Sequence, residues 1–200
     1  MFVPMLLLML RLVPAEGAQQ ASLDIEDVKE MLRATDQIGG EQKKLLSLGE
    51  KAFPIYLRIL SSKVSEPLEV SRVFVVVAAV KGDRSQFLEP AIASLSHSDD
   101  SVRRNAATLI ALIGSPRDSA PLVALLSDKE WTVSVAAVKA IAAIGDHRSL
   151  QAIDCWLNGS IPTGSDRPEK ELRKHVTKHR DELHLRLEKE KLEGERPRKK

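Results

Sequence analysis

Apolar residues recur along the middle of the chain with helical spacing, and the pattern repeats itself. The segments 102–114 and 133–145 carry Val, Ala, Ile, Ala, Ile and Gly in the same order, each 31 residues after its counterpart. The shorter apolar segments that follow, 119–126 and 149–157, keep the same step. A fixed period of this length is typical of proteins in which one helical hairpin packs on the next.

Each unit is predicted to be a helix, a glycine-marked turn and a shorter second helix. The second helices are expected at 53–62, 88–96, 119–126 and 149–157. We expect the turn glycines to adopt the left-handed conformation that ends a helix; they are Gly82, Gly114 and Gly145. Prolines fall where a missing N–H matters least, in the first turn of a second helix; they are Pro54, Pro90 and Pro121. The prediction is an all-α protein, a short α-solenoid of about four hairpins over residues 22–157 plus a C-terminal charged helix.

One apolar run favours two different structures. Residues 73–80 are rich in β-branched side chains, and local propensity favours a buried strand there. Their place in the repeat is that of a first helix, and no other segment offers a partner strand. We therefore predict a helix that is buried on most sides.

The N-terminal segment resembles a targeting sequence. An apolar run covers residues 2–10, and Ala15 and Gly17 suit a signal-peptidase site. The run is shorter than the roughly 20 residues that span a bilayer. We predict a signal peptide over residues 1–17 and an exported protein, periplasmic or extracellular. The alternative is a buried amphipathic first helix.

The composition changes after Trp156. Turn-forming residues fill a predicted linker at 158–167, and 168–200 are expected to form a charged helix with a disordered basic end. From residue 166 onward there are 13 Lys and Arg against 9 Asp and Glu. Ion pairs Glu169–Arg173 and Glu182–Arg186 are expected within the helix. Its thin apolar stripe would dock on a neighbour or pair weakly with another copy; the stripe is Leu172, Val176, Leu183 and Leu187.

Composition narrows the class of protein. Apolar residues make up 43% and charged residues 29%, a balance typical of a soluble globular chain. The formal net charge of +2 does not mark the whole chain as a nucleic-acid or membrane binder. The single cysteine, Cys155, excludes an intrachain disulfide and a cysteine-rich zinc site.

The stretch 95–157 resembles HEAT-like repeats, of the short kind also found in phycobilin lyases. One copy matches at Leu95, Val102, Arg103, Ala106, Ala107 and Gly114, and the next at Leu126, Asp128, Val133, Ala136, Ala137, Ile144 and Gly145. His97 replaces the expected Asp in one copy, and Ser134 replaces the expected Arg in the other. The resemblance implies that Arg103 and Asp128 pair between adjacent repeats. It also implies that the second helices line a concave face that takes the partner.

Few residues favour catalysis or cofactor binding. Asp99 and Asp100 stand where a helix begins, so capping explains them better than paired catalytic carboxylates. His175 and His179 share a helix face near His184, a spacing that can hold a metal but is also usual on a solvated helix. Cys155 is either a small core residue or a reactive thiol. We expect no catalytic residues, no cofactor and no metal.

The sequence thus favours a protein-protein interaction scaffold that is not an enzyme. The ionisable side chains of its second helices sum to −1, too few cations for a nucleic-acid groove. We expect a peptide or a helix of another protein to bind the second-helix side; the residues predicted to contact it are Arg58, Ile92, Val123 and Asp154. The alternatives are a lyase-type enzyme or enzyme subunit of the HEAT-like family and a binder of anionic surfaces through the charged tail.

Overall fold

The computed structural model describes residues 24–34, 40–159 and 169–194, and every regular element in these ranges is helical. The expected signal peptide, most of the expected linker and the basic end at 195–200 lie outside the described residues.

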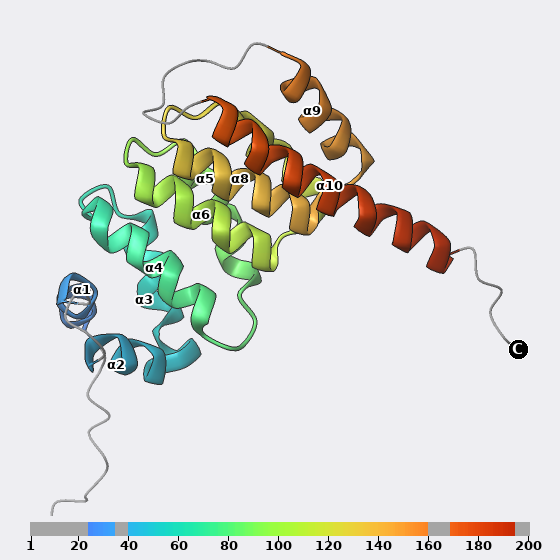
Figure 1. Cartoon of the computed structure of the whole chain (residues 1–200). Coiled ribbons are helices and arrows are strands. Elements are labelled where there is room, and N and C mark those ends of the chain that lie inside the picture. The colour runs from blue at the N-terminus through green and yellow to red at the C-terminus, as the bar shows by residue number, and fades with distance from the viewer. Residues whose placement is uncertain (1–23, 35–39, 160–168, 195–200) are drawn as a thin grey trace, which may run out of the picture.

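The elements follow one another as pairs of helices (Figure 1). The first unit holds α1 (Ile25–Ala34), α2 (Gly40–Leu48), the 3-10 turn η1 (Gly49–Ala52) and α3 (Phe53–Ser61). Next come α4 (Pro67–Ala79), η2 (Ser85–Phe87) and α5 (Leu88–Ser94), then α6 (Asp100–Ile113), η3 (Pro116–Ser119), α7 (Ala120–Ala124) and η4 (Leu125–Ser127). The last pair is α8 (Trp131–Ile144) and α9 (His147–Asn158), and α10 (Glu169–Gly194) follows.

The first helices form one layer, in which α4, α6, α8 and α10 pack side by side (Figure 1). The second helices lie against that layer, with α3 in contact with α5 and α7 in contact with α9. The expected all-α solenoid is confirmed. The first unit differs from the others because α1 and α2 together precede its second helix.

The first-helix layer is held by aliphatic and small side chains. Ala106, Ala107 and Ala137 are fully buried, so α6 and α8 approach closely, while Ile110 and Ile141 fill the space beside them. The β-branched run is helical from Val73 to Ala79, as its repeat position predicts, and Val80 is the extended residue that ends the helix. Packing on both flanks overrides the strand propensity of these residues.

Two of the turn glycines correct the sequence prediction. Gly82 has a positive φ of 131°, but Gly114 and Gly145 have φ of −78° and −65° and are extended. Glycine is required at these two positions because a Cβ atom would lie too close to neighbouring atoms. A Cβ on Gly145 would lie 2.5 Å from the carbonyl oxygen of Ile141 and 2.8 Å from the Cβ of Ser149. The absence of a side chain lets the second helix start directly against the end of the first.

Helix α10 takes the position of a further first helix. It packs against both α8 and α9, as α8 packs against α6 and α7. Its buried side chains are the four of the predicted stripe plus His179. Of the two expected ion pairs, Glu169–Arg173 is present at 2.8 Å. The Glu182–Arg186 prediction is wrong, because Glu182 pairs with His179 and Arg186 pairs with Glu190.

Candidate functional site

The four side chains predicted to contact a partner lie on four successive second helices. Arg58 on α3 is exposed, whereas Ile92 on α5 and Val123 on α7 are half-buried and pack against the core. Asp154 on α9 accepts hydrogen bonds from Arg180 of α10, at 2.8 Å from Nε and 3.3 Å from Nη2. Asp154 therefore has a partner within the chain.

A set of exposed positions on the second helices and their flanking turns repeats with the same step of 31 residues. We call these positions the second-helix face. They are Arg58 on α3, then three equivalent rows: Gln86, Glu89, Ala93 and Ser96; Arg117, Ala120, Ala124 and Ser127; Arg148, Gln151, Cys155 and Asn158. Sequence reasoning chose Ile92 and Val123 and missed their neighbours Ala93 and Ala124. The sequence did contain a signal for the exposed positions: in both repeats a large apolar residue is followed directly by a small one, and the pair recurs after 31 residues.

Charge is confined to one side of this face. The positions in the later turns of the second helices are all small and uncharged; they are Ala93, Ser96, Ala124, Ser127, Cys155 and Asn158. Covering such side chains removes no charge from water and freezes few rotamers. The arrangement suits contact with another polypeptide.

Cys155 lies on this face and is exposed, so the core interpretation of this residue is wrong. A neighbouring side chain, Trp156, crosses to the preceding repeat and donates a hydrogen bond from Nε1 to the Ser127 hydroxyl at 3.0 Å. This contact ties the last row of the face to the row before it.

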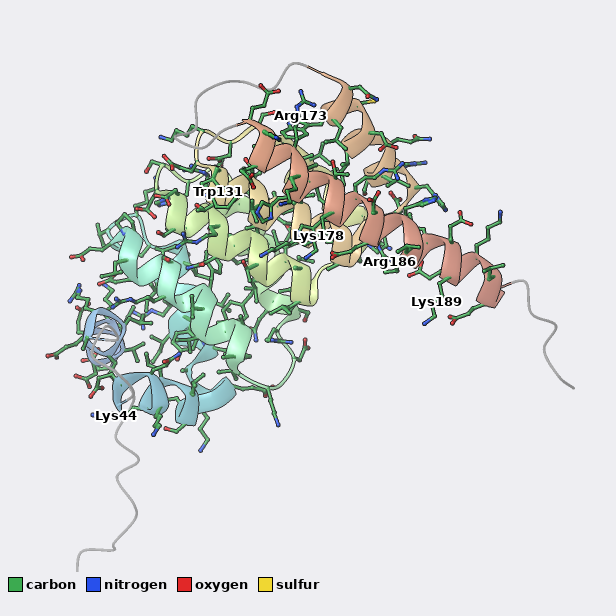
Figure 2. All side chains as sticks on the ribbon, in the orientation of Figure 1. Lys44, Trp131, Arg173, Lys178, Arg186 and Lys189 are labelled. Carbon is green, nitrogen blue, oxygen red and sulfur yellow. The ribbon has the colours of Figure 1, made fainter. Side chains whose placement is uncertain are left out.

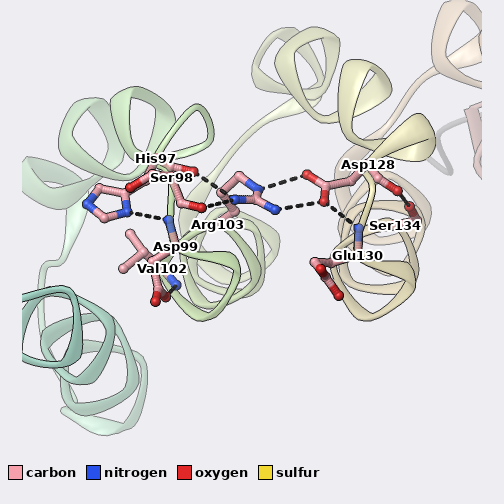
Figure 3. Close-up of polar contacts among 8 residues, drawn as sticks. All are labelled: His97, Ser98, Asp99, Val102, Arg103, Asp128, Glu130 and Ser134. Atoms are coloured by element: carbon pink, nitrogen blue, oxygen red, sulfur yellow. Dashed lines mark hydrogen bonds and ion pairs between the residues drawn. The ribbon is translucent and has the colours of Figure 1, made fainter. Parts of the chain in front are cut away.

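An ion pair joins two adjacent repeats, as the resemblance to HEAT-like repeats implies (Figure 3). Arg103 of α6 donates to both carboxylate oxygens of Asp128 at 2.8 Å, and also to the carbonyls of His97 and Ser98. Asp128 accepts from the backbone N–H of Glu130 at 2.9 Å. The carboxylate therefore holds the loop before α8 to the preceding repeat.

The two departures from the repeat pattern keep part of this geometry (Figure 3). His97 stands 31 residues before Asp128, and its Nδ1 accepts from the backbone N–H of Asp99 at 3.0 Å. Ser134 stands 31 residues after Arg103, and its hydroxyl donates to the Asp128 carbonyl at 3.4 Å. Both loops thus keep a side-chain contact to the backbone at the turn.

Two carboxylates cap the N-termini of helices, as the sequence predicts for Asp99. Asp99 accepts from the backbone N–H of Val102 at 3.1 Å at the start of α6. Asp146 accepts from the backbone N–H groups of Arg148 and Ser149 at the start of α9, and the hydrogen bond from Ser149 lowers the pKa of Asp146.

Two histidines of α10, His175 and His179, contact other side chains of the chain. His179 is buried, and its Nδ1 lies 2.6 Å from Oε2 of Glu182; this hydrogen bond lowers the pKa of Glu182. The ring of His175 lies 5.5 Å from that of Trp131 on α8. Within the described ranges, no three His, Cys, Asp or Glu side chains gather closely enough to hold a metal ion. In the same ranges no helix has the length and apolar character to cross a bilayer.

Comparison with known proteins agrees with this architecture. A family model of HEAT repeats matches residues 88–158, which include α5 to α9 and the Arg103–Asp128 pair. No curated protein matches the chain. The specific similarity to the repeats of phycobilin lyases stays a prediction. Residues 88–158 of this chain are therefore HEAT-like repeats.

Proposed function

We propose that this protein is a scaffold that binds a peptide or a single helix of another protein through the second-helix face. HEAT repeats commonly serve as protein-interaction scaffolds, and stacked repeats present extended surfaces for that purpose. The function needs no bond chemistry, and we propose that the chain is not an enzyme.

The observation that carries the proposal is the regular arrangement of exposed positions. Three consecutive second helices present equivalent side chains 31 residues apart, and two positions in each row are small and uncharged. The first helices of successive repeats pack side by side, and packed helices lie about 8–10 Å apart, which sets the step between rows. Three rows therefore offer a strip about 20–30 Å long, which a helix of four to five turns would cover.

Charged side chains bound the strip on one side. Arg117 and Arg148 occupy the same position in adjacent repeats. The equivalent residue one repeat earlier is Gln86, and the charged residue there is Glu89, three positions further along. A partner with an apolar or small-residue stripe beside polar residues would match this division. Binding would depend on shape and on burial of apolar atoms, with the charged border fixing orientation.

The native cysteine offers a direct test, because it is the chain's single thiol and lies on the face. A maleimide-benzophenone attached to Cys155 is expected to cross-link the partner in extract of the source cell. The matched control carries Cys155→Ala and Thr108→Cys, which moves the probe to an exposed position of α6 in the first-helix layer. Equal cross-linking of the same protein from both positions would contradict the proposal.

A further inference from the structure

Three arginines of α10 contact the second half of α9, its C-terminal end and the turn from which it starts. Arg173 donates to the carbonyls of Leu157 and Gly159 at the end of α9. Arg180 binds the Asp154 carboxylate in the second half of α9. Arg186 donates to the carbonyl of Gly145, in the turn from which α9 starts, and to that of Ala142. The two helices therefore run antiparallel.

These contacts supply hydrogen-bond donors to backbone carbonyls at the ends of helices. The last carbonyls of a helix have no intrahelical donor, and a guanidinium beside them also interacts favourably with the helix dipole. Arg173 supplies this contact to α9, and Arg186 supplies it to α8. Figure 2 shows Arg173 and Arg186 in different turns of α10, and the sequence places Arg180 between them. One helix thereby fixes both ends of the turn-and-helix segment 145–159.

Other elements hold α9 as well, and one of them is η3, whose Ser119 hydroxyl lies 2.7 Å from the Ser149 hydroxyl of α9. Its contacts are most extensive with α10, and it also touches α7. Leu150 and Ile153 bury on its inner side, and Trp156 donates to Ser127 as described above. The first-helix partner of its own hairpin, α8, packs mainly against α6 and α10. Among the contacts that position α9, those with α10 are the most extensive.

We infer that α10 is a positioning element for the partner site: its arginines place α9, and α9 presents the last row of the second-helix face. Gln151, Cys155 and Asn158 are exposed on the helix that Arg173 and Arg180 hold, and Arg186 holds the turn before it. The link to partner binding rests on the proposed function, whereas the placement of α9 by α10 does not.

Amide hydrogen exchange of the full chain tests the placement. Arg180→Asp and Asp154→Arg each set like charges against one another, and the double variant restores the pair in reverse. Each single variant is expected to exchange about three- to tenfold faster than wild type at the amides of 150–158. The double variant should recover most of the protection. Lys189→Ala, in an exposed ion pair with Glu193 on the same helix, is the control.

Three results would overturn the inference. They are unchanged exchange of α9 in the single variants, no recovery in the double variant, and an equal acceleration in α5 and α9, which would indicate a general loss of stability.

A row-specific readout separates this inference from the proposed function. The benzophenone probe is placed either at Cys155, in the row held by α10, or at Ala93→Cys in a Cys155→Ala background, two rows away. Arg180→Asp is expected to reduce the cross-linking yield at Cys155 about threefold or more and to leave that at position 93 unchanged. Equal reductions at both positions would contradict the inference. Absence of cross-links at both positions when Arg180 is intact would count against the proposed function, while the exchange result would still decide the placement of α9.

Discussion

Arg103 and Asp128 form a two-pronged ion pair between consecutive repeats, with both N–O distances at 2.8 Å and each side chain only 7% exposed. The same guanidinium binds two carbonyls of its own turn, so four acceptors surround it. Its fixed fork matches the carboxylate, which a lysine would not do. The distance between these two residues therefore sets how one hairpin of the HEAT segment stacks on the next.

Removing one member of this pair should destabilise the protein strongly. Arg103→Ala leaves Asp128 buried without its main partner, and we expect a loss of about 3–5 kcal/mol in the free energy of unfolding. Urea denaturation followed by circular dichroism measures it. The double variant Arg103→Met, Asp128→Leu should lose much less than Arg103→Ala. A loss below about 1 kcal/mol in Arg103→Ala would show that the pair is not structurally important.

Two leucines of α10 distinguish docking of this helix from mere helix formation. Leu183 is fully buried, whereas Leu185 is 68% exposed on the opposite side. Leu183→Ala is expected to cost about 2–5 kcal/mol, and Leu185→Ala about 0.5 kcal/mol or less. Thermal or urea denaturation of both variants checks this. Equal effects of the two substitutions would mean that α10 does not join the core.

Sequence periodicity predicted the central helices well and the role of α10 only partly. The repeat phase assigned residues 73–80 to a helix against their strand propensity, because packing positions recur even where local preference differs. The apolar stripe of α10 could be predicted from the sequence, but the helices against which it packs could not. Its charged composition shows no repeat signature, and only the three-dimensional contacts reveal that it continues the first-helix layer.

Glycine substitutions should separate steric from conformational requirements. Gly145→Ala places a Cβ against a backbone oxygen, and we expect a cost of about 1–3 kcal/mol. Gly49 has open space around it but a φ of 56°, so Gly49→Ala should cost about 1–2 kcal/mol through backbone strain. Gly40→Ala meets neither problem and serves as the control in the same denaturation series. A neutral Gly145→Ala would contradict the close approach of Ile141 and Ser149 to this position.

The candidate face was predicted at the level of helices, and its individual residues were not. The repeat identified which helices present a surface, but a shift of one position along a helix turns a side chain by about 100°. That rotation separates half-buried Val123 from exposed Ala124. Asp154 was a reasonable choice from composition, yet its partner Arg180 lies 26 residues away on a helix whose docking the sequence did not specify.

Ionisation of Tyr56 should destabilise the folded protein at alkaline pH. Burial raises the pKa of this phenol from 10.0 to about 12. A group whose pKa is higher in the folded state stabilises the fold fully below pH 10, and the contribution is lost as the pH rises from 10 to about 12. The loss is about 3 kcal/mol.

The chain's single tyrosine makes the titration clean, because the absorbance of tyrosinate near 295 nm reports one group. We expect a midpoint well above 10 in the native protein and near 10 in urea. Tyr56→Phe should flatten the dependence of stability on pH between 10 and 12. A native midpoint near 10 would contradict the burial of this hydroxyl.

The central claim is that the second-helix face binds the partner, and the affinity of one pair of variants tests it most directly. Ala124→Arg puts a long cation into the uncharged strip, while Ala143→Arg makes the same change at an exposed alanine of α8 in the first-helix layer. The measurement is the dissociation constant of the cross-linked partner segment for both variants and wild type, by calorimetry. The account predicts binding weakened about tenfold or more by Ala124→Arg and unchanged by Ala143→Arg. Wild-type affinity in Ala124→Arg, or an equal loss in both variants, would contradict it.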